Sequence, residues 1–218
     1  MQVQLIPVVE LFYLVDQIPL PADGPYWEHV ETWRQYHERA LQTNGFSPRL
    51  RPYAPGSAFH RIADLSEADI AQLVRLHCAE GLQGSGDWQS IRPLPGGYVL
   101  RVGSVDVLFP QCCSDLGDLR SWQSIAQGKG AYLYSGHPSP DISQQNQCAS
   151  FDFNPNGQGE GFVPPPPLHS VSVPLSALTR AVQDADRELR IFAARLALLN
   201  AGQALNIPAI EKLLIHGR

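Results

Sequence analysis

The chain has 218 residues, of which 44% are hydrophobic, and a formal net charge of -5 at pH 7. That hydrophobic fraction is sufficient for a buried core, so disorder is not expected to dominate. The negative net charge and the scattered arginines argue against nucleic-acid binding, because a concentrated basic surface is needed to displace counterions from phosphates. We therefore expect no nucleic-acid partner.

The apolar stretch Met1–Val15 is interrupted by Glu10 and lacks the basic leader and the small-residue cleavage site of a secretory signal. No segment reaches the roughly 20 consecutive apolar residues that span a bilayer. We therefore expect a cytoplasmic protein with no membrane partner. In that compartment the cysteines are expected to be free, buried thiols rather than disulfides. They are Cys78, Cys112, Cys113 and Cys148.

The first part of the chain predicts a strand region followed by two helices. Val3–Val15 is rich in β-branched and aromatic residues but contains Pro7, which predicts two short strands or one broken edge strand. Aromatic and apolar residues at steps of three and four predict an amphipathic helix over Tyr26–Asn44. A loop over Phe46–Phe59 precedes a second helix, whose start at Ser66 is marked by the sequence Ser-Glu-Ala-Asp.

The strongest strand pattern lies near the centre of the chain. Two strands, Tyr98–Val102 and Val105–Phe109, flank Gly103-Ser104, and glycine at the first turn position predicts a type II′ hairpin. A short helix follows, with Ser114 or Asp115 as its N-cap.

Beyond this hairpin the sequence predicts short strands and a long helix. The strands are Ala131–Tyr134, Ala149–Phe153 and Ser170–Val173. Four consecutive prolines at 164–167 predict a stiff polyproline II spacer. Apolar residues at alternating steps of four and three then predict a long amphipathic helix over Ser176–Asn200, and Pro208 opens a last short helix.

These elements predict an α+β fold with a single mixed or antiparallel sheet, flanking helices and a long C-terminal amphipathic helix. We expect one domain over residues 1–218, in which a proline-rich linker at 164–167 precedes a C-terminal helical segment at 176–216. The apolar face of the long helix is wider than a coiled-coil seam, which favours packing within the chain. The sequence leaves the oligomeric state and the order of the strands open.

Cys112 and Cys113 are candidate nucleophiles, because a thiol just before a helix lies near unsatisfied backbone donors that stabilise the thiolate. Catalysis would also need a base, and the candidates are His137 and His169, which both fall in predicted loop or strand-end positions. The alternative interpretation is structural, with one cysteine in the core and its neighbour facing outward. No cofactor is expected.

The segment Asp152-Phe-Asn154-Pro-Asn156-Gly157 matches the first half of a calcium-binding loop. Its oxygen ligands would be Asp152, Asn154 and Asn156. Position twelve of such a loop is Val163, where a bidentate glutamate is expected. Because Asn-Pro-Asn-Gly is a strong turn sequence in its own right, we favour an exposed loop and expect no metal.

Another group of residues suits contact with a protein partner. Asp115 and Asp118 lie on one helical turn, although their simpler role is to place negative charge at a helix N-terminus. Nearby aromatic side chains are suited to lining a cleft, although core packing explains most of them equally well. The candidate partner-binding residues are Asp115, Asp118, Trp88, Tyr132, Tyr134 and His137.

The stretches Phe109-Pro-Gln-Cys-Cys-Ser-Asp-Leu116, with Trp122, and Tyr134-Ser-Gly-His-Pro138 resemble bacterial immunity proteins that accompany polymorphic toxins. The resemblance implies a small cytosolic α/β protein that occludes a toxin and has no chemistry of its own. Two hypotheses follow from the sequence. The chain is a non-catalytic binding protein with a toxin as partner, which we favour, or a cysteine-dependent hydrolase or transferase that uses Cys112 or Cys113.

Overall fold

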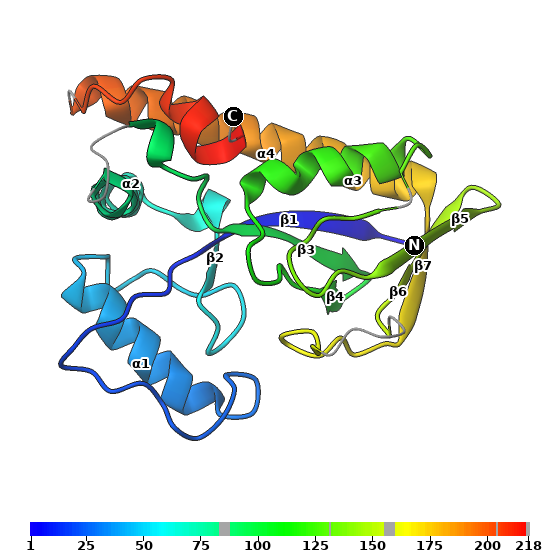
Figure 1. Ribbon diagram of the computed structural model, residues 1–218, viewed down its shortest axis with the longest axis horizontal. Coiled ribbons are helices and arrows are strands. Elements are labelled where there is room, and N and C mark those ends of the chain that lie inside the picture. The colour runs from blue at the N-terminus through cyan, green and yellow to red at the C-terminus, as the bar shows by residue number, and fades with distance from the viewer. Residues whose placement is uncertain (83–87, 131, 155–159, 204, 217–218) are drawn as a thin grey trace. The chain divides into compact units, whose positions relative to one another are not determined.

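The computed structural model describes residues 1–82, 88–130, 132–154, 160–203 and 205–216 (Figure 1). The chain divides into two compact units. Unit 1 contains Met1–Pro7 and Pro95–Ile191, and unit 2 contains Val8–Leu94 and Phe192–Arg218. The predicted α+β class is confirmed, with antiparallel strands, flanking helices and a long C-terminal helix α4 at Leu175–Gly202.

The described residues form two antiparallel sheets, where the sequence predicted a single sheet. The four-stranded sheet has the order β2-β1-β3-β4 and the three-stranded sheet has the order β5-β6-β7. Two strands were missed because β2 is only three residues long and β5 has mainly polar side chains. The strands are β1 (Val3–Glu10), β2 (Phe59–Arg61), β3 (Gly96–Val102), β4 (Val105–Leu108), β5 (Asp141–Gln145), β6 (Cys148–Asp152) and β7 (Ser170–Pro174).

Strand β1 is one continuous strand that lies between β2 and β3, so the prediction of two short strands or a broken edge strand was wrong. Its pairing with β2 covers Val8–Glu10. Pro7 lies before that pairing, so its missing N–H removes no hydrogen bond to β2. Residues 5–9 are all buried, as in a strand covered on both faces.

In unit 1 the central hairpin is confirmed. Val102 pairs with Val105, and Gly103 between them has φ +63°, the left-handed conformation that the first position of a type II′ turn requires. The predicted strand at Ala131–Tyr134 is absent as a strand: Ala131 lies outside the described residues, and Tyr132 forms an isolated bridge with Asp141.

The short helix after the hairpin begins with the one-turn η3 (Leu116–Asp118) and continues as α3 (Leu119–Ala126). Asp115 is the cap, because its carboxylate accepts from the Gly117 N–H at 2.7 Å and the Asp118 carboxylate accepts from the Asp115 N–H at 3.0 Å. Ser114, the other candidate cap, instead donates its hydroxyl to the carbonyl of Gly96.

Part of the core of unit 1 lies between α3 and the three-stranded sheet. Trp122 of α3 packs on Phe151 of β6, with ring centroids 5.7 Å apart. Helix α3 runs beside α4, and the Thr179 hydroxyl donates to the carbonyl of Ala126 at 3.2 Å (Figure 1).

Unit 2 contains α1 (Val30–Thr43), η1 (Ile62–Asp64), α2 (Glu67–Leu82), η2 (Trp88–Ser90) and the π-helical turn η4 (Lys212–His216). Ser66 caps α2 as predicted, since its hydroxyl accepts from the Asp69 N–H at 3.2 Å and the Asp69 carboxylate accepts from the Ser66 N–H at 3.3 Å. Arg195, in the second part of α4, pairs with Glu67 at 2.7 Å and so ties α4 to the start of α2. Among the described residues, no helix combines the length and the apolar character needed to cross a bilayer.

Candidate functional site

Most of the candidate site residues lie together in unit 1, around Tyr134. The His137 N–H donates to the carbonyl of Cys112 at 3.0 Å, and the rings of Tyr134 and His137 meet edge to face at 5.9 Å. The Tyr134 hydroxyl lies 3.4 Å from the carbonyl oxygen of Cys113. We call this group the dithiol surface. It comprises Cys112, Cys113, Asp115, Asp118, Tyr132, Tyr134 and His137.

Other members of the dithiol surface affect the pKa of the Tyr134 hydroxyl. Burial raises the pKa of the Tyr134 hydroxyl, and Asp118, Cys113, Tyr132 and Asp115 raise it further. Each of these groups disfavours a negative charge on the phenol. These residues come from two separate segments of the chain, 112–118 and 132–137.

The two segments meet backbone to backbone. The Gln111 N–H donates to the carbonyl of Ser135 at 2.8 Å, beside the bond from His137 to Cys112. Gly136 has φ +88°, and a Cβ atom there would collide with the carbonyl oxygens of Gln111 and Cys112. Only glycine allows this approach, so Gly136 positions the dithiol surface.

The two thiols are both exposed, and their Sγ atoms are 3.3 Å apart. The expectation of buried thiols is therefore wrong for Cys112 and Cys113, and so is the structural alternative in which one of them packs into the core. The contact of His137 with Cys112 runs through main-chain atoms, and the imidazole packs against Tyr134.

Asp115 and Asp118 are half-buried carboxylates whose pKa values are raised. Burial raises the pKa of Asp118 to about 7; the hydrogen bond from the Asp115 N–H opposes this shift and the charge of Asp115 adds to it. Burial also raises the pKa of Asp115. Asp118 therefore exists in both protonation states near neutral pH, and a neighbouring cation would shift it to the ionised state.

The remaining candidates are described separately. Trp88 is half-buried in η2, which is part of unit 2. In the calcium-loop segment, the Asp152 carboxylate accepts from the Asn154 N–H at 2.9 Å, and this hydrogen bond forms a local turn. Asn156 lies outside the described residues. Within the part of the chain that the structure describes, no three His, Cys, Asp or Glu side chains are arranged to hold a metal ion.

The sequence did not point to a second feature, a small pocket in unit 2 between α1 and the loop before β2. Two of the residues that line it are histidines, with His37 5% exposed and His60 1% exposed. Nδ1 of His37 and Nε2 of His60 are buried without a hydrogen-bond partner among the described residues. The pocket volume of about 20 Å³ is enough for one water molecule.

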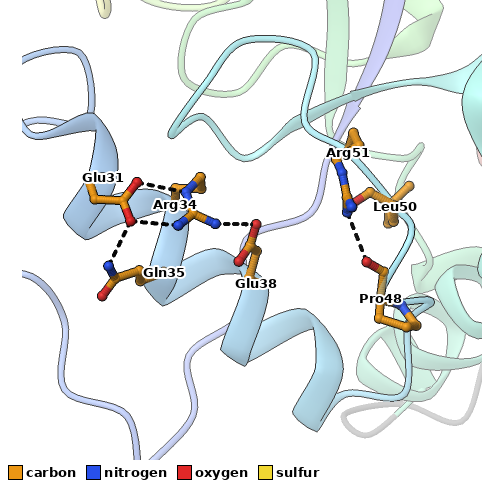
Figure 2. A network of polar contacts seen from close by, with 7 residues as sticks. All are labelled: Glu31, Arg34, Gln35, Glu38, Pro48, Leu50 and Arg51. Carbon is orange, nitrogen blue, oxygen red and sulfur yellow. Dashed lines mark hydrogen bonds and ion pairs between the residues drawn. The ribbon is translucent and has the colours of Figure 1, made fainter.

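Charged side chains on α1 border this histidine pocket. Arg34 pairs with Glu31 and Glu38 at N···O distances of 2.5 and 2.6 Å. Figure 2 shows Arg34 between these two carboxylates, and it shows Arg51 donating to the carbonyl of Pro48. Burial lowers the pKa of both histidines to about 4, and the charge of His60 contributes to the shift of His37. Both imidazoles are therefore neutral at pH 7. No local signal marks this pair, because only the tertiary fold places His60 of β2 near α1.

Comparisons of the chain with protein-family models, with curated proteins and with solved structures gave no match. The geometry of the dithiol surface is therefore the basis for assigning a function.

Proposed function

We propose that the chain is a binding protein of the immunity type, which occludes a bacterial toxin through the dithiol surface. The observation that carries the proposal is the convergence of residues from two segments. Five of the six residues that the sequence indicated for partner contact are in unit 1 and belong to the dithiol surface. They are Asp115, Asp118, Tyr132, Tyr134 and His137.

The tyrosines have the chemistry of interface anchors. Tyr132 is 63% exposed, so most of its ring is open to a partner. Tyrosine provides a large apolar area and a hydroxyl with few rotatable bonds, which is why it is enriched among the residues that dominate binding energies. The ring contact between Tyr134 and His137 and the main-chain bonds beneath them hold these side chains in place, which lowers the entropy cost of binding.

The carboxylates favour a partner with basic groups. A lysine or arginine of the toxin beside Asp118 would lower the pKa of Asp118 from about 7 and hold the carboxylate ionised. Complex formation then releases protons near neutral pH. Titration calorimetry in buffers of different ionisation enthalpy measures this release directly.

The test is co-expression with the product of the neighbouring gene, followed by pull-down, an affinity measurement and a toxicity assay. We expect Tyr132→Ala and Tyr134→Ala each to weaken the complex about tenfold or more. Ile191→Ala is the matched control, because Ile191 is a similarly exposed large side chain, at 58%, outside the dithiol surface. The proposal is abandoned if no complex forms and the chain protects against no neighbouring toxin.

A second candidate function is a cysteine-dependent hydrolase or transferase. The observation in its favour is that both thiols are exposed and that His137 lies beside Cys112. The test is the rate of thiol alkylation against pH, together with turnover of a panel of activated esters. A catalytic thiol would react faster than Cys148 at neutral pH, and Cys112→Ser or Cys113→Ser would abolish turnover. Equal alkylation rates and no turnover would exclude this function.

A further inference from the structure

Cys112 and Cys113 are neighbours in the chain, and their sulfur atoms are also neighbours in space. In an extended segment, successive side chains point to opposite faces. Here Cys113 has φ +71°, outside the extended region, and the Sγ atoms lie 3.3 Å apart. Both residues are exposed, so a small oxidant reaches either thiol.

We infer that Cys112 and Cys113 form a redox site, in which a reversible disulfide between adjacent residues is made and broken by a low-molecular-weight disulfide couple such as glutathione. One thiolate attacks a sulfur of oxidised glutathione, which forms a mixed disulfide and releases one reduced glutathione. The neighbouring thiolate then attacks the protein sulfur of the mixed disulfide and releases a second reduced glutathione. Two protein thiols are oxidised and one glutathione disulfide is reduced, so electrons and protons balance.

Proximity favours the second step. After the first exchange, the attacking sulfur is already beside its target, so ring closure competes well with the return of glutathione. A mixed disulfide on the pair is therefore a short-lived intermediate, whereas a mixed disulfide on an isolated cysteine would persist.

The resulting disulfide is easily reduced. Adjacent Cα atoms are about 3.8 Å apart across a trans peptide, shorter than the roughly 4.4 to 6.8 Å that ordinary disulfides span. The ring is therefore strained, and strained, exposed disulfides have the higher reduction potentials that are typical of labile or regulatory bonds. The bond opens again when reduced glutathione is in excess.

The other cysteines are poor competitors for the oxidant. Cys78 is buried, and burial raises its thiol pKa to about 11, so little thiolate is present. Cys148 is half-buried in β6. Oxidation by glutathione is therefore directed to Cys112 and Cys113.

Formation of the disulfide is expected to change the positions of the partner-binding side chains of Tyr134 and His137. The carbonyl of Cys112 accepts from the His137 N–H, and the carbonyl of Cys113 is within reach of the Tyr134 hydroxyl. Closing the ring changes the backbone of this turn and so disturbs both contacts. Oxidation then weakens binding of the toxin; this consequence depends on the proposed function, whereas disulfide formation does not.

The experiment treats the folded chain with oxidised glutathione, alkylates the remaining thiols and digests the protein with trypsin. The tryptic peptide Val102–Arg120 contains Cys112 and Cys113 and no other cysteine. We expect this peptide to lose two hydrogen atoms, to escape alkylation and to regain both thiols after treatment with excess reduced glutathione. The peptides that carry Cys78 and Cys148 should remain alkylated.

Single-cysteine variants are the matched controls. Cys112→Ser and Cys113→Ser each retain one thiol, so the peptide should stop at a stable mixed disulfide that carries one glutathionyl group. The inference is overturned if the unmodified chain instead keeps one or two glutathionyl groups, forms a disulfide to Cys148, or stays fully alkylated. If the disulfide forms but the affinity for the toxin does not change, the redox site is supported. Only the claim that oxidation controls toxin binding is then rejected.

Discussion

The main chain of Gly136 lies directly against the carbonyl oxygen of Cys112, and a Cβ atom at Gly136 would overlap that oxygen. The next residue, His137, donates its N–H to the same carbonyl at 3.0 Å. The segment that carries the two thiols and the segment that carries Tyr134 are therefore held together by main-chain packing. The dithiol surface depends on a glycine that itself presents no side chain to a partner.

Gly136→Ala should destabilise the chain by more than about 2 kcal/mol, because the substitution adds a steric overlap to a residue with φ +88°. Gly103→Ala is the matched control: Gly103 also has a positive φ, +63°, but no atom lies within 4 Å of its added Cβ. It should cost about 1 kcal/mol, from backbone strain alone. Urea unfolding of both variants measures the difference, and equal losses would show that the close approach at Gly136 is unimportant.

Asp118 should make stability depend on pH. Its pKa in the folded chain is about 7, raised from 3.8, so the protonated form favours folding. This contribution is fully present below about pH 4 and is lost as pH rises through about 7. Asp118→Asn keeps an oxygen that accepts from the Asp115 N–H and removes the titration. Its stability should therefore fall less than that of the parent over this range, as urea midpoints at a series of pH values would show. An unchanged pH profile would contradict the shifted pKa.

Features set by neighbouring residues were predictable from the sequence. The cap at Asp115 depends on Asp118 three residues later, and the hairpin depends on Gly103 at its turn. His137 was the candidate base for the cysteines and Tyr134 a candidate for partner contact, but the sequence provided no reason for their segment to approach the cysteines. That reason is Gly136, whose role is visible only when the opposing carbonyls are placed.

Features that depend on long-range pairing were not predictable. Strand β5, with the sequence DISQQ, has too few apolar residues to indicate a strand, and it forms because β6 offers a partner along its whole length. Pro7 suggested a break in β1, but the pairing with β2 begins only at Val8. The His37 and His60 pocket also depends on tertiary structure, because neither residue has a local signal.

The two buried histidines should make unit 2 sensitive to acid. Their pKa values are about 4 in the folded chain, below the ordinary 6.5, because burial disfavours the charged imidazole. Their stabilising contribution is present above about pH 6.5 and is lost as pH falls through about 4. The double variant His37→Gln/His60→Gln should lose less stability than the parent over this range. His169→Gln, at an exposed position, is the control, and a double variant with the acid sensitivity of the parent would contradict the prediction.

The side chain of Gln111 binds the residue that precedes the proline run at 164–167. The buried amide of Gln111 accepts from the Val163 N–H at 2.8 Å and donates to the Val163 carbonyl at 3.1 Å, so it pairs both main-chain groups of the residue before the first proline. Gln111→Ala leaves these groups without the amide and should cost about 1 to 3 kcal/mol.

Gln111→Glu removes only one of the two hydrogen bonds. A carboxylate still accepts from the Val163 N–H, but it no longer donates to the Val163 carbonyl. The chain should therefore be destabilised in both variants, and cleavage near residues 160–163 by a nonspecific protease should be faster than in the parent. Gln35→Ala is the control, because Gln35 is an exposed glutamine that donates to Glu31 on the surface of α1. If Gln111→Ala and Gln35→Ala were cleaved equally fast, Gln111 would not be the attachment point, and the proline run would be held by its packing instead.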